Sequence, residues 1–408
     1  MINIAILGYG TVGSGVFGVI RTNQAIVDKN AGEEIRVKYV LDLRDFPGDP
    51  VEEVLTHDYE TILQDEEVKI VVEVMGGLKP AYDFVKRALQ NGKSVCTSNK
   101  ELVANYGPEL LRTARENRVN FLFEASCGGG IPIIRPLQTS LTADRIEEIS
   151  GILNGTTNYI LTKMKTEGLG FEEALKSAQE NGFAERDPSA DIEGGDACRK
   201  IAILSSLAYG KTLDFKEIPT EGITKITHKD IELIEELGYA VKLIATCFSV
   251  EGKSQTDTEY HALVAPMLVN KEHPLYSING VFNAVLVKGN MLGDTMYYGR
   301  GAGKYPTASA VVSDVIAAAG SLEETLPVRW TEEKLTLSDN GSLVRSFYVR
   351  AEGKFAERLS EVEKLFGKPV RTAEAGDEFC FITPPVSEKE FTEAYGKLSK
   401  AVNWIRLV

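Results

Sequence analysis

Short apolar segments alternate with helical segments over the first 130 residues, and this alternation limits the possible folds more than any other feature of the chain. Five of these segments have the apolar, β-branched character of buried strands. They are residues 2–7, 37–41, 68–75, 93–98 and 120–125. Apolar strands joined through helices form parallel sheets that are covered on both faces. The sequence therefore predicts an α/β domain with a Rossmann-type parallel sheet over residues 1–130.

A glycine-rich turn, GYGTVG, directly follows the first strand and opens a helix. Glycines at this junction allow a tight turn and let a pyrophosphate approach the helix N-terminus. We therefore expect a dinucleotide cofactor here. The residues expected to bind it are Gly8, Gly10, Thr11, Val12 and Gly13.

Two residues at the end of the second strand bear on the choice of cofactor. Asp42 suits the ribose hydroxyls of NAD, whereas Arg44 suits the 2′-phosphate of NADP. Since both are present, the residues alone leave the preference open.

The pattern changes after residue 130. Residues 131–325 contain helices and then several strand-like segments separated by turns, which predicts an α+β domain with a mostly antiparallel sheet. A helix near 305–320 is expected to pack back on the first domain. Residues 326–342 have the composition of a linker. Residues 343–408 follow the order strand, helix, strand, strand, helix, strand, which predicts a small ferredoxin-like βαββαβ domain.

Local signals place several helices in the second domain. Thr227 is a side-chain cap for a helix that ends at Gly238. The polar segment 251–259 is expected to be a hairpin tip. Further helices are expected at 156–167, 171–181 and 196–209.

Charge and cysteine content exclude several classes of partner. The chain has 59 acidic and 45 basic residues, a net charge of −14, which argues against nucleic acid and anionic membranes. Five cysteines without a CxxC pair favour a reducing cytoplasm and argue against disulfides.

The N-terminal segment is expected to be a strand and not a signal peptide. The histidines form no cluster that indicates zinc; they are His57, His228, His261 and His273.

Carboxylates crowd into residues 185–196, directly before Arg199 and Lys200. Their spacing does not match a calcium-binding EF-hand loop. A second interpretation is a solvated acidic loop in which Asp196 caps the next helix. The carboxylates are Glu185, Asp187, Asp191, Glu193 and Asp196.

A third interpretation of this segment is chemical. If the helix starts at Asp196, Lys200 lies four residues later on the same face, so that an ammonium group is held in place. Reduction of a carbonyl leaves an alkoxide, which needs a positive group and then a proton. The remaining carboxylates suit the ammonium group of a substrate, which indicates an amino-acid aldehyde.

Six strings of the sequence together resemble the homoserine dehydrogenase family. They are GYGTVGSGV (8–16), TSNKELVA (97–104), FEASCGGGIPIIRPL (123–137), ILNGTTNYIL (152–161), DPSADIEGGDACRK (187–200) and GRGAGKYPTASAVVSD (299–314). The resemblance covers about residues 1–325, with the strings in order. It implies reversible reduction of L-aspartate 4-semialdehyde to L-homoserine with NAD(P)H, in threonine and methionine biosynthesis, by a cytoplasmic homodimer or homotetramer.

The resemblance also implies roles for individual residues. Lys200 matches the catalytic acid and base, and Asp196 matches its partner. Lys100 matches a second lysine between cofactor and substrate. Glu185 and Asp191, together with Lys200, match substrate-binding residues.

Further matches concern the cofactor. Thr97, Ser98, Lys100 and Gly303 match cofactor contacts. Arg44 matches an arginine of NADP-using relatives, which favours NADP with NAD also accepted.

The segment 124–131 resembles a loop that binds sodium or potassium mostly through backbone carbonyls. The resemblance implies cation ligands at Glu124, Cys127, Gly129 and Ile131. The residues alone also permit a simple bend between domains, with Cys127 as a packing residue.

Two alternative functions stay open at this point. One is another NAD(P)-dependent semialdehyde reductase or amino-acid dehydrogenase on the same scaffold. The other is a non-catalytic nucleotide-sensing regulator, against which the presence of Lys200 argues.

The C-terminal order of elements resembles an ACT domain, an amino-acid-sensing module. Its usual Asp-x-Pro-Gly turn is absent from 351–355, so weak or no threonine inhibition is expected.

Overall fold

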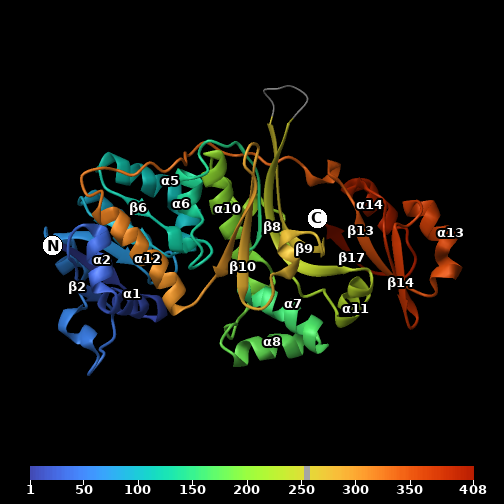
Figure 1. Cartoon of the computed structure of the whole chain (residues 1–408), viewed down its shortest axis with the longest axis horizontal. Helices are drawn as coiled ribbons and strands as arrows, with labels where there is room; N and C mark the ends of the chain where they lie inside the picture. Colours follow the sequence, from blue (N-terminus) through green and yellow to red (C-terminus); the bar gives the residue numbers. More distant parts are fainter. Residues whose placement is uncertain (252–257) are drawn as a thin grey trace. The chain divides into compact units, whose positions relative to one another are not determined.

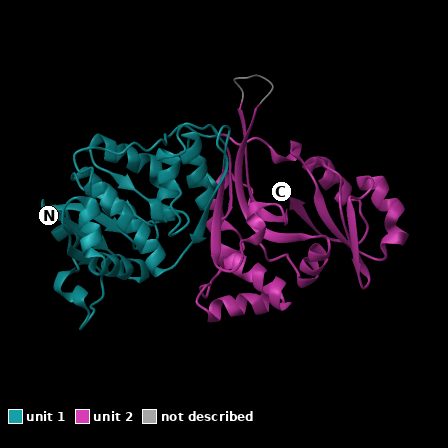
Figure 2. Cartoon of the chain, viewed as in Figure 1, with its two compact units in different colours: residues 1–146, 199–215, 288–335 teal, residues 147–198, 216–287, 336–408 magenta. Residues whose placement is uncertain are grey.

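The computed structural model describes residues 1–251 and 258–408, which divide into two compact units (Figures 1 and 2). The expected hairpin tip at 251–259 falls largely on 252–257, outside the described residues. None of the helices in the described part of the chain combines the length and apolar character that a membrane crossing requires. Unit 1 comprises residues 1–146, 199–215 and 288–335, and unit 2 comprises residues 147–198, 216–287 and 336–408.

Unit 1 is built on a six-stranded parallel sheet, as the sequence predicts, with the strand order β3-β2-β1-β4-β5-β6. Its central strand β1 is buried along its whole length. The predicted strand at 120–125 is shorter in the structure, because a 3₁₀ turn, η2 (Glu124–Ser126), follows its first residues. The strands are β1 (Ile2–Leu7), β2 (Ile35–Leu41), β3 (Leu55–Thr56), β4 (Val68–Glu73), β5 (Ser94–Thr97) and β6 (Phe121–Leu122).

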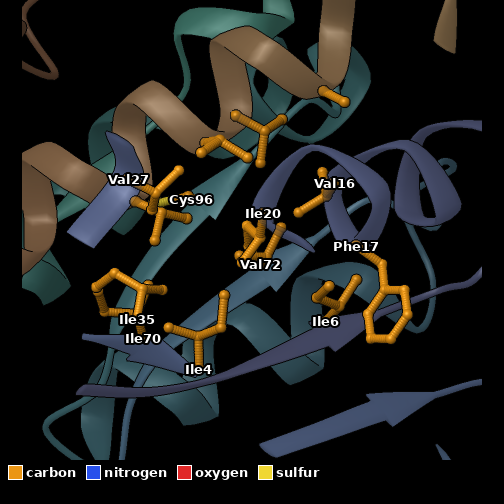
Figure 3. Close-up of a cluster of buried hydrophobic side chains, with 14 of the residues drawn as sticks. Ile4, Ile6, Val16, Phe17, Ile20, Val27, Ile35, Ile70, Val72 and Cys96 are labelled. Atoms are coloured by element: carbon orange, nitrogen blue, oxygen red, sulfur yellow. The ribbon is translucent and has the colours of Figure 1, made fainter. Parts of the chain in front are cut away.

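The helices of unit 1 bury their apolar faces against this sheet. One core cluster joins β1 and β4 to α1, and Figure 3 shows Ile6, Val16 and Ile20 within it. The late helix α12 adds Ala308 and Val311 to the same cluster. The helices are α1 (Thr11–Thr22), α2 (Gln24–Ala31), α3 (Tyr59–Gln64), α4 (Ala81–Gln90), α5 (Lys100–Glu116), α6 (Ile134–Thr139) and α12 (Lys304–Ala319), with a 3₁₀ turn η1 (Pro50–Val54) and a late strand β11 (Gly293–Arg300).

The segment 326–342 contains a buried aromatic side chain. Trp330 is almost completely shielded from solvent, and its Nε1 donates a hydrogen bond to Oγ1 of Thr212 at 3.0 Å. This part of the segment is therefore packed into unit 1.

The first part of unit 2 combines helices with an antiparallel sheet, as predicted. β8 pairs with both β7 and β9 in antiparallel register. Thr227 caps α11 as expected, and Asp230 completes a capping box by accepting from the Thr227 N–H at 3.0 Å. The later part of α10, the start of η3 and the end of β10 belong to unit 1. The elements are β7 (Ile146–Ile152), α7 (Gly155–Glu167), α8 (Phe171–Glu180), α9 (Ser189–Ile192), α10 (Gly195–Tyr209), η3 (Phe215–Glu217), α11 (His228–Glu236), β8 (Tyr239–Glu251), β9 (Thr258–Asn270), η4 (Pro274–Ser277) and β10 (Phe282–Gly289).

The C-terminal part of unit 2 has the predicted βαββαβ order. Its antiparallel strands lie in the order β17-β13-β15-β14, and β17 also pairs with β9 in parallel. The elements are η5 (Asn340–Ser342), β12 (Val344–Arg345), β13 (Phe347–Glu352), α13 (Phe355–Phe366), β14 (Arg371–Ala375), β15 (Glu378–Ile382), β16 (Val386–Ser387), α14 (Glu388–Tyr395) and β17 (Ala401–Leu407).

A buried ion pair ties β13 to α11. Arg350 lies 2.8 Å from Asp230, and their side chains are 6% and 0% exposed. Arg350 also pairs with Glu378 at 2.7 Å and donates to Thr227. Charges this deeply buried need such partners, because they have lost their hydration. The pair therefore anchors the C-terminal module to the rest of unit 2.

We predict that Arg350→Met lowers the free energy of unfolding of unit 2 by about 3–5 kcal/mol, because it leaves the charge of Asp230 buried without this partner. Denaturant-induced unfolding of the whole chain measures the change. In the double variant Arg350→Met/Asp230→Asn neither charge remains, so at least half of the lost stability should return. No recovery in the double variant would contradict this account.

Candidate active site

The glycine turn after β1 is shaped by one positive φ angle and one close backbone approach. Gly8 has φ +97°, a conformation that other residues rarely adopt. A Cβ atom on Gly13 would lie 1.9 Å from the carbonyl oxygen of Gly8, so a side chain cannot be accommodated there. Gly10 is the N-cap residue of α1, and a Cβ atom at this position would meet nothing within 4 Å. The turn thus leaves open space at the helix N-terminus.

The start of α1 has the electrostatics of an anion site. Thr11 and Val12 occupy its first turn, which contains no acidic residue. The first N–H groups of a helix lack partners within the helix and favour negative charge. These residues therefore fit the pyrophosphate of a dinucleotide.

Asp42 and Arg44 are paired with each other at the end of β2. Arg44 donates from Nε and Nη2 to the two oxygens of Asp42 at 2.9 and 3.0 Å, and the N–H of Tyr9 donates to Asp42 at 2.8 Å. The Arg44 guanidinium holds the pKa of Asp42 well below its usual range. Arg44 is 62% exposed and lies over the ring of Phe46. The negative charge of Asp42 is thus largely offset.

The predicted cofactor contacts Thr97 and Ser98 lie at the carboxyl end of β5. Asn99 caps α5 by accepting from the N–H of Leu102 at 3.0 Å, and Lys100 is the first residue of that helix. The hydroxyl of Thr97 donates to the buried carboxylate of Glu73 at 2.6 Å. Sequence reasoning missed Glu73, although an acidic residue within an otherwise apolar strand was a usable signal.

The acidic segment leads directly into α10. The structure corrects one interpretation here: α10 begins at Gly195, so Asp196 lies in the first turn and is not the cap. Asp196 and Lys200 are 3% and 8% exposed. Their four-residue spacing places both on one face of the helix, as predicted.

The side chain of Asn154 fixes two of the carboxylates. Its Nδ2 donates to Asp191 at 2.7 Å and to Asp196 at 2.9 Å. Its Oδ1 accepts from the N–H of Thr157 at 2.8 Å and thereby caps α7. Sequence reasoning included Asn154 in a family string but assigned it no role.

Two other predicted site residues are Glu185, in the acidic segment, and Gly303, directly before α12. Glu185 is exposed, and its backbone carbonyl accepts from the side chain of Gln179 at 3.1 Å. Gly303 has φ +120° and is the N-cap residue of α12.

The segment 124–131 begins with a buried carboxylate, that of Glu124. Glu124 accepts from the N–H groups of Ile133, Ile134 and Arg135 at 2.6, 2.8 and 2.7 Å. Its own N–H donates to Asp314, and burial together with the charge of Glu124 raises the pKa of Asp314 to about 7. The side chain of Glu124 is thus engaged by N–H donors.

The rest of this segment is a tight turn. A Cβ atom on Gly129 would lie 2.5 Å from the backbone of Gly301, and the thiol of Cys127 lies 3.7 Å from the backbone carbonyl of Lys200. Among the described residues, no group of three or more His, Cys, Asp or Glu side chains has a metal-binding arrangement. The cation expected at Glu124, Cys127, Gly129 and Ile131 stays a prediction.

Comparison with known proteins assigns the family. Residues 132–316 match the family described as homoserine dehydrogenase, and residues 8–124 match the homoserine dehydrogenase NAD-binding domain. A homoserine dehydrogenase of Synechocystis is 47% identical over 323 residues, which cover 78% of this chain and 73% of the relative.

Solved structures agree with the sequence matches. A homoserine dehydrogenase from Thiobacillus denitrificans has a TM-score of 0.89 and 35% identity, and the match covers 100% of this chain and 98% of that one. A mutant of a hyperthermophilic archaeal homoserine dehydrogenase in complex with NADPH has a TM-score of 0.64 and 31% identity, over 78% of this chain and 97% of that one. The chain therefore belongs to the homoserine dehydrogenase family and is a nicotinamide-dependent oxidoreductase of amino-acid biosynthesis.

Proposed function

We propose that α10 carries the acid and base of the homoserine dehydrogenase reaction, with Lys200 as the catalytic residue and Asp196 as its partner. The observation that carries this assignment is the placement of both side chains, buried and one turn apart, on a helix that Asn154 ties to α7 through Asp196. The nicotinamide cofactor, when bound, supplies the hydride that reduces aspartate 4-semialdehyde.

Lys200 acts on the oxygen of the substrate aldehyde. As the carbonyl carbon is reduced, negative charge develops on its oxygen, and the ammonium group of Lys200 stabilises that charge and then donates a proton to give homoserine. The same amine accepts the proton in the reverse direction. Asp196 orients the ammonium group of Lys200. Lys100, at the start of α5, provides a second positive group at the reacting end of the substrate.

Substrate recognition rests on the acidic segment. Asp191 and Glu185 bind the ammonium group of the substrate, since carboxylates are its natural partners. The hydrogen bond from Asn154 holds Asp191 in place before the substrate arrives. Glu185 is exposed on the loop and is free to meet the ligand from the solvent side.

The cofactor is NADP, with NAD also accepted. Thr97, Ser98 and Gly303 contact it beside the glycine turn. The ion pair between Arg44 and Asp42 at the end of β2 supports this preference, because Arg44 offsets the charge of Asp42 that would otherwise repel a 2′-phosphate. The archaeal relative, which binds NADPH, supports it as well.

Four further assignments complete the proposal. Sodium or potassium binds the backbone carbonyls of segment 124–131. The chain acts in the cytoplasm, consistent with five buried cysteines that form no disulfide. It forms a homodimer or homotetramer, for which the exposed apolar side chains of Met296 and Tyr298 on β11 offer a surface. The C-terminal module is an ACT-like domain.

We predict that Lys200→Met lowers kcat by about 10²–10⁴-fold with little change in cofactor affinity, because it removes the proton donor but keeps the packing of the side-chain stem. Oxidation of NADPH with aspartate 4-semialdehyde measures kcat. Lys93→Met is the matched control, since Lys93 is also a buried lysine but donates to the backbone of Asp65 and Val68. Turnover close to that of the wild type in the Lys200 variant would overturn the assignment.

We predict that Arg44→Ala raises KM for NADPH by about tenfold or more, because a charge-assisted hydrogen bond to the 2′-phosphate is lost. KM for NADH should stay nearly unchanged, since NADH lacks that phosphate. Arg36→Ala removes an exposed positive charge from β2, the strand that precedes Arg44, and should change neither value. An equal rise of KM for both cofactors in the Arg44 variant would show that Arg44 is only a surface charge without a contact to the 2′-phosphate.

A further inference from the structure

Glu73 is a buried carboxylate to which the proposed reaction assigns no role. It is the last residue of β4 and is fully shielded from solvent. Its backbone carbonyl accepts from the N–H of Ser98 at 3.3 Å, and the next residue, Val74, donates to Leu7 of β1 at 3.0 Å. Glu73 therefore lies where the glycine turn and the predicted cofactor contacts of β5 meet.

The groups around the Glu73 carboxylate donate hydrogen bonds to it. Oε1 accepts from the N–H of Met75 at 2.8 Å and from the N–H of Gly76 at 3.3 Å, and Oε2 accepts from the hydroxyl of Thr97 at 2.6 Å. Burial raises the pKa of Glu73 above its usual value, and these donors offset only part of the rise. Because backbone N–H groups can only donate, this arrangement suits an ionised carboxylate.

Glu73 closes a ring of hydrogen bonds between two loops. Oγ1 of Thr97 accepts from the N–H of Asn99 at 2.9 Å, and Nδ2 of Asn99 donates to the carbonyl of Gly77 at 2.6 Å. The same Asn99 caps α5, which begins with Lys100. One carboxylate thus fixes the loop after β4, the hydroxyl of Thr97 and the start of the helix that carries Lys100.

We propose that Glu73 is a positioning residue of the cofactor site and that its buried negative charge makes the site bind the oxidised cofactor more tightly relative to the reduced one. The inference rests on the proposed placement of the cofactor against Thr97. Dinucleotides lie across the carboxyl ends of parallel strands, where β4 and β5 end. The oxidised nicotinamide ring carries a positive charge that the reduced ring lacks, and a buried anion acts on this charge with little screening.

Binding of NADP⁺ and NADPH to the Glu73→Gln variant tests the proposal. Calorimetry gives Kd for NADP⁺, and the fluorescence of the reduced cofactor gives Kd for NADPH. Glutamine keeps the shape of the side chain and an acceptor for Met75 but removes the charge. We expect the ratio of Kd for NADP⁺ to Kd for NADPH to rise about tenfold over that of the wild type. A ratio within twofold of the wild type would overturn the proposal.

Lys93→Met is again the matched control, because it removes a buried charge that contacts the amino end of the same strand. Its Kd ratio should equal that of the wild type, and a tenfold rise there would also overturn the proposal. If Glu73→Gln does not fold, Glu73→Asp and Glu73→Asn make the same comparison, with the higher ratio expected for Asn. A wild-type chain that binds neither form of the cofactor would instead refute the proposed cofactor site.

Discussion

The side-chain amide of Asn154 is the contact on which the geometry of the acidic segment depends. The five carboxylates between Glu185 and Asp196 carry like charges and repel one another. One amide group donates to Asp191 and to Asp196, while its oxygen caps α7. Because α7 is packed into unit 2, the amide fixes the positions of these two carboxylates relative to that helix. Asp196 in turn belongs to the first turn of α10, the helix that also carries Lys200.

Two other carboxylates near the ends of strands and helices are also held by hydrogen-bond donors, in these cases mainly backbone N–H groups. Glu73 is held by backbone N–H groups of the loop after β4, and Glu124 by the N–H groups at the start of α6. Each is a buried anion stabilised by donors whose positions the backbone fixes. Such donors need no reorganisation when a ligand binds, which is the property a catalytic site requires. A chain with a net charge of −14 thus buries several of its acidic groups against donors of fixed position.

Features that depend on neighbours in the sequence could be predicted from it. The apolar strand β1, the glycines of the following turn and the capping box of Thr227 and Asp230 are set by residues at most a few positions apart. The order of the C-terminal elements was predictable for the same reason, since each element has its own pattern.

Features that depend on distant partners could not be predicted. Asn154 binds carboxylates 37 and 42 residues away, and Glu73 binds a hydroxyl 24 residues away. Asp196 had two local interpretations, as a cap or as part of the first turn, and only the observed start of α10 decides between them. The spacing of Asp196 and Lys200 and the resemblance to a family pointed to these two residues, but neither pointed to Asn154, which binds Asp196.

The most direct test of the central claim is the kcat/KM of Asn154→Asp for aspartate 4-semialdehyde. Aspartate caps a helix as well as asparagine does, so α7 should stay intact. The two hydrogen bonds to Asp191 and Asp196 become repulsive contacts, and loss of hydrogen bonds to charged groups predicts a fall of about 10- to 100-fold in kcat/KM. A kcat/KM within threefold of the wild type would show that the acidic segment keeps its geometry without this amide, and would contradict the account.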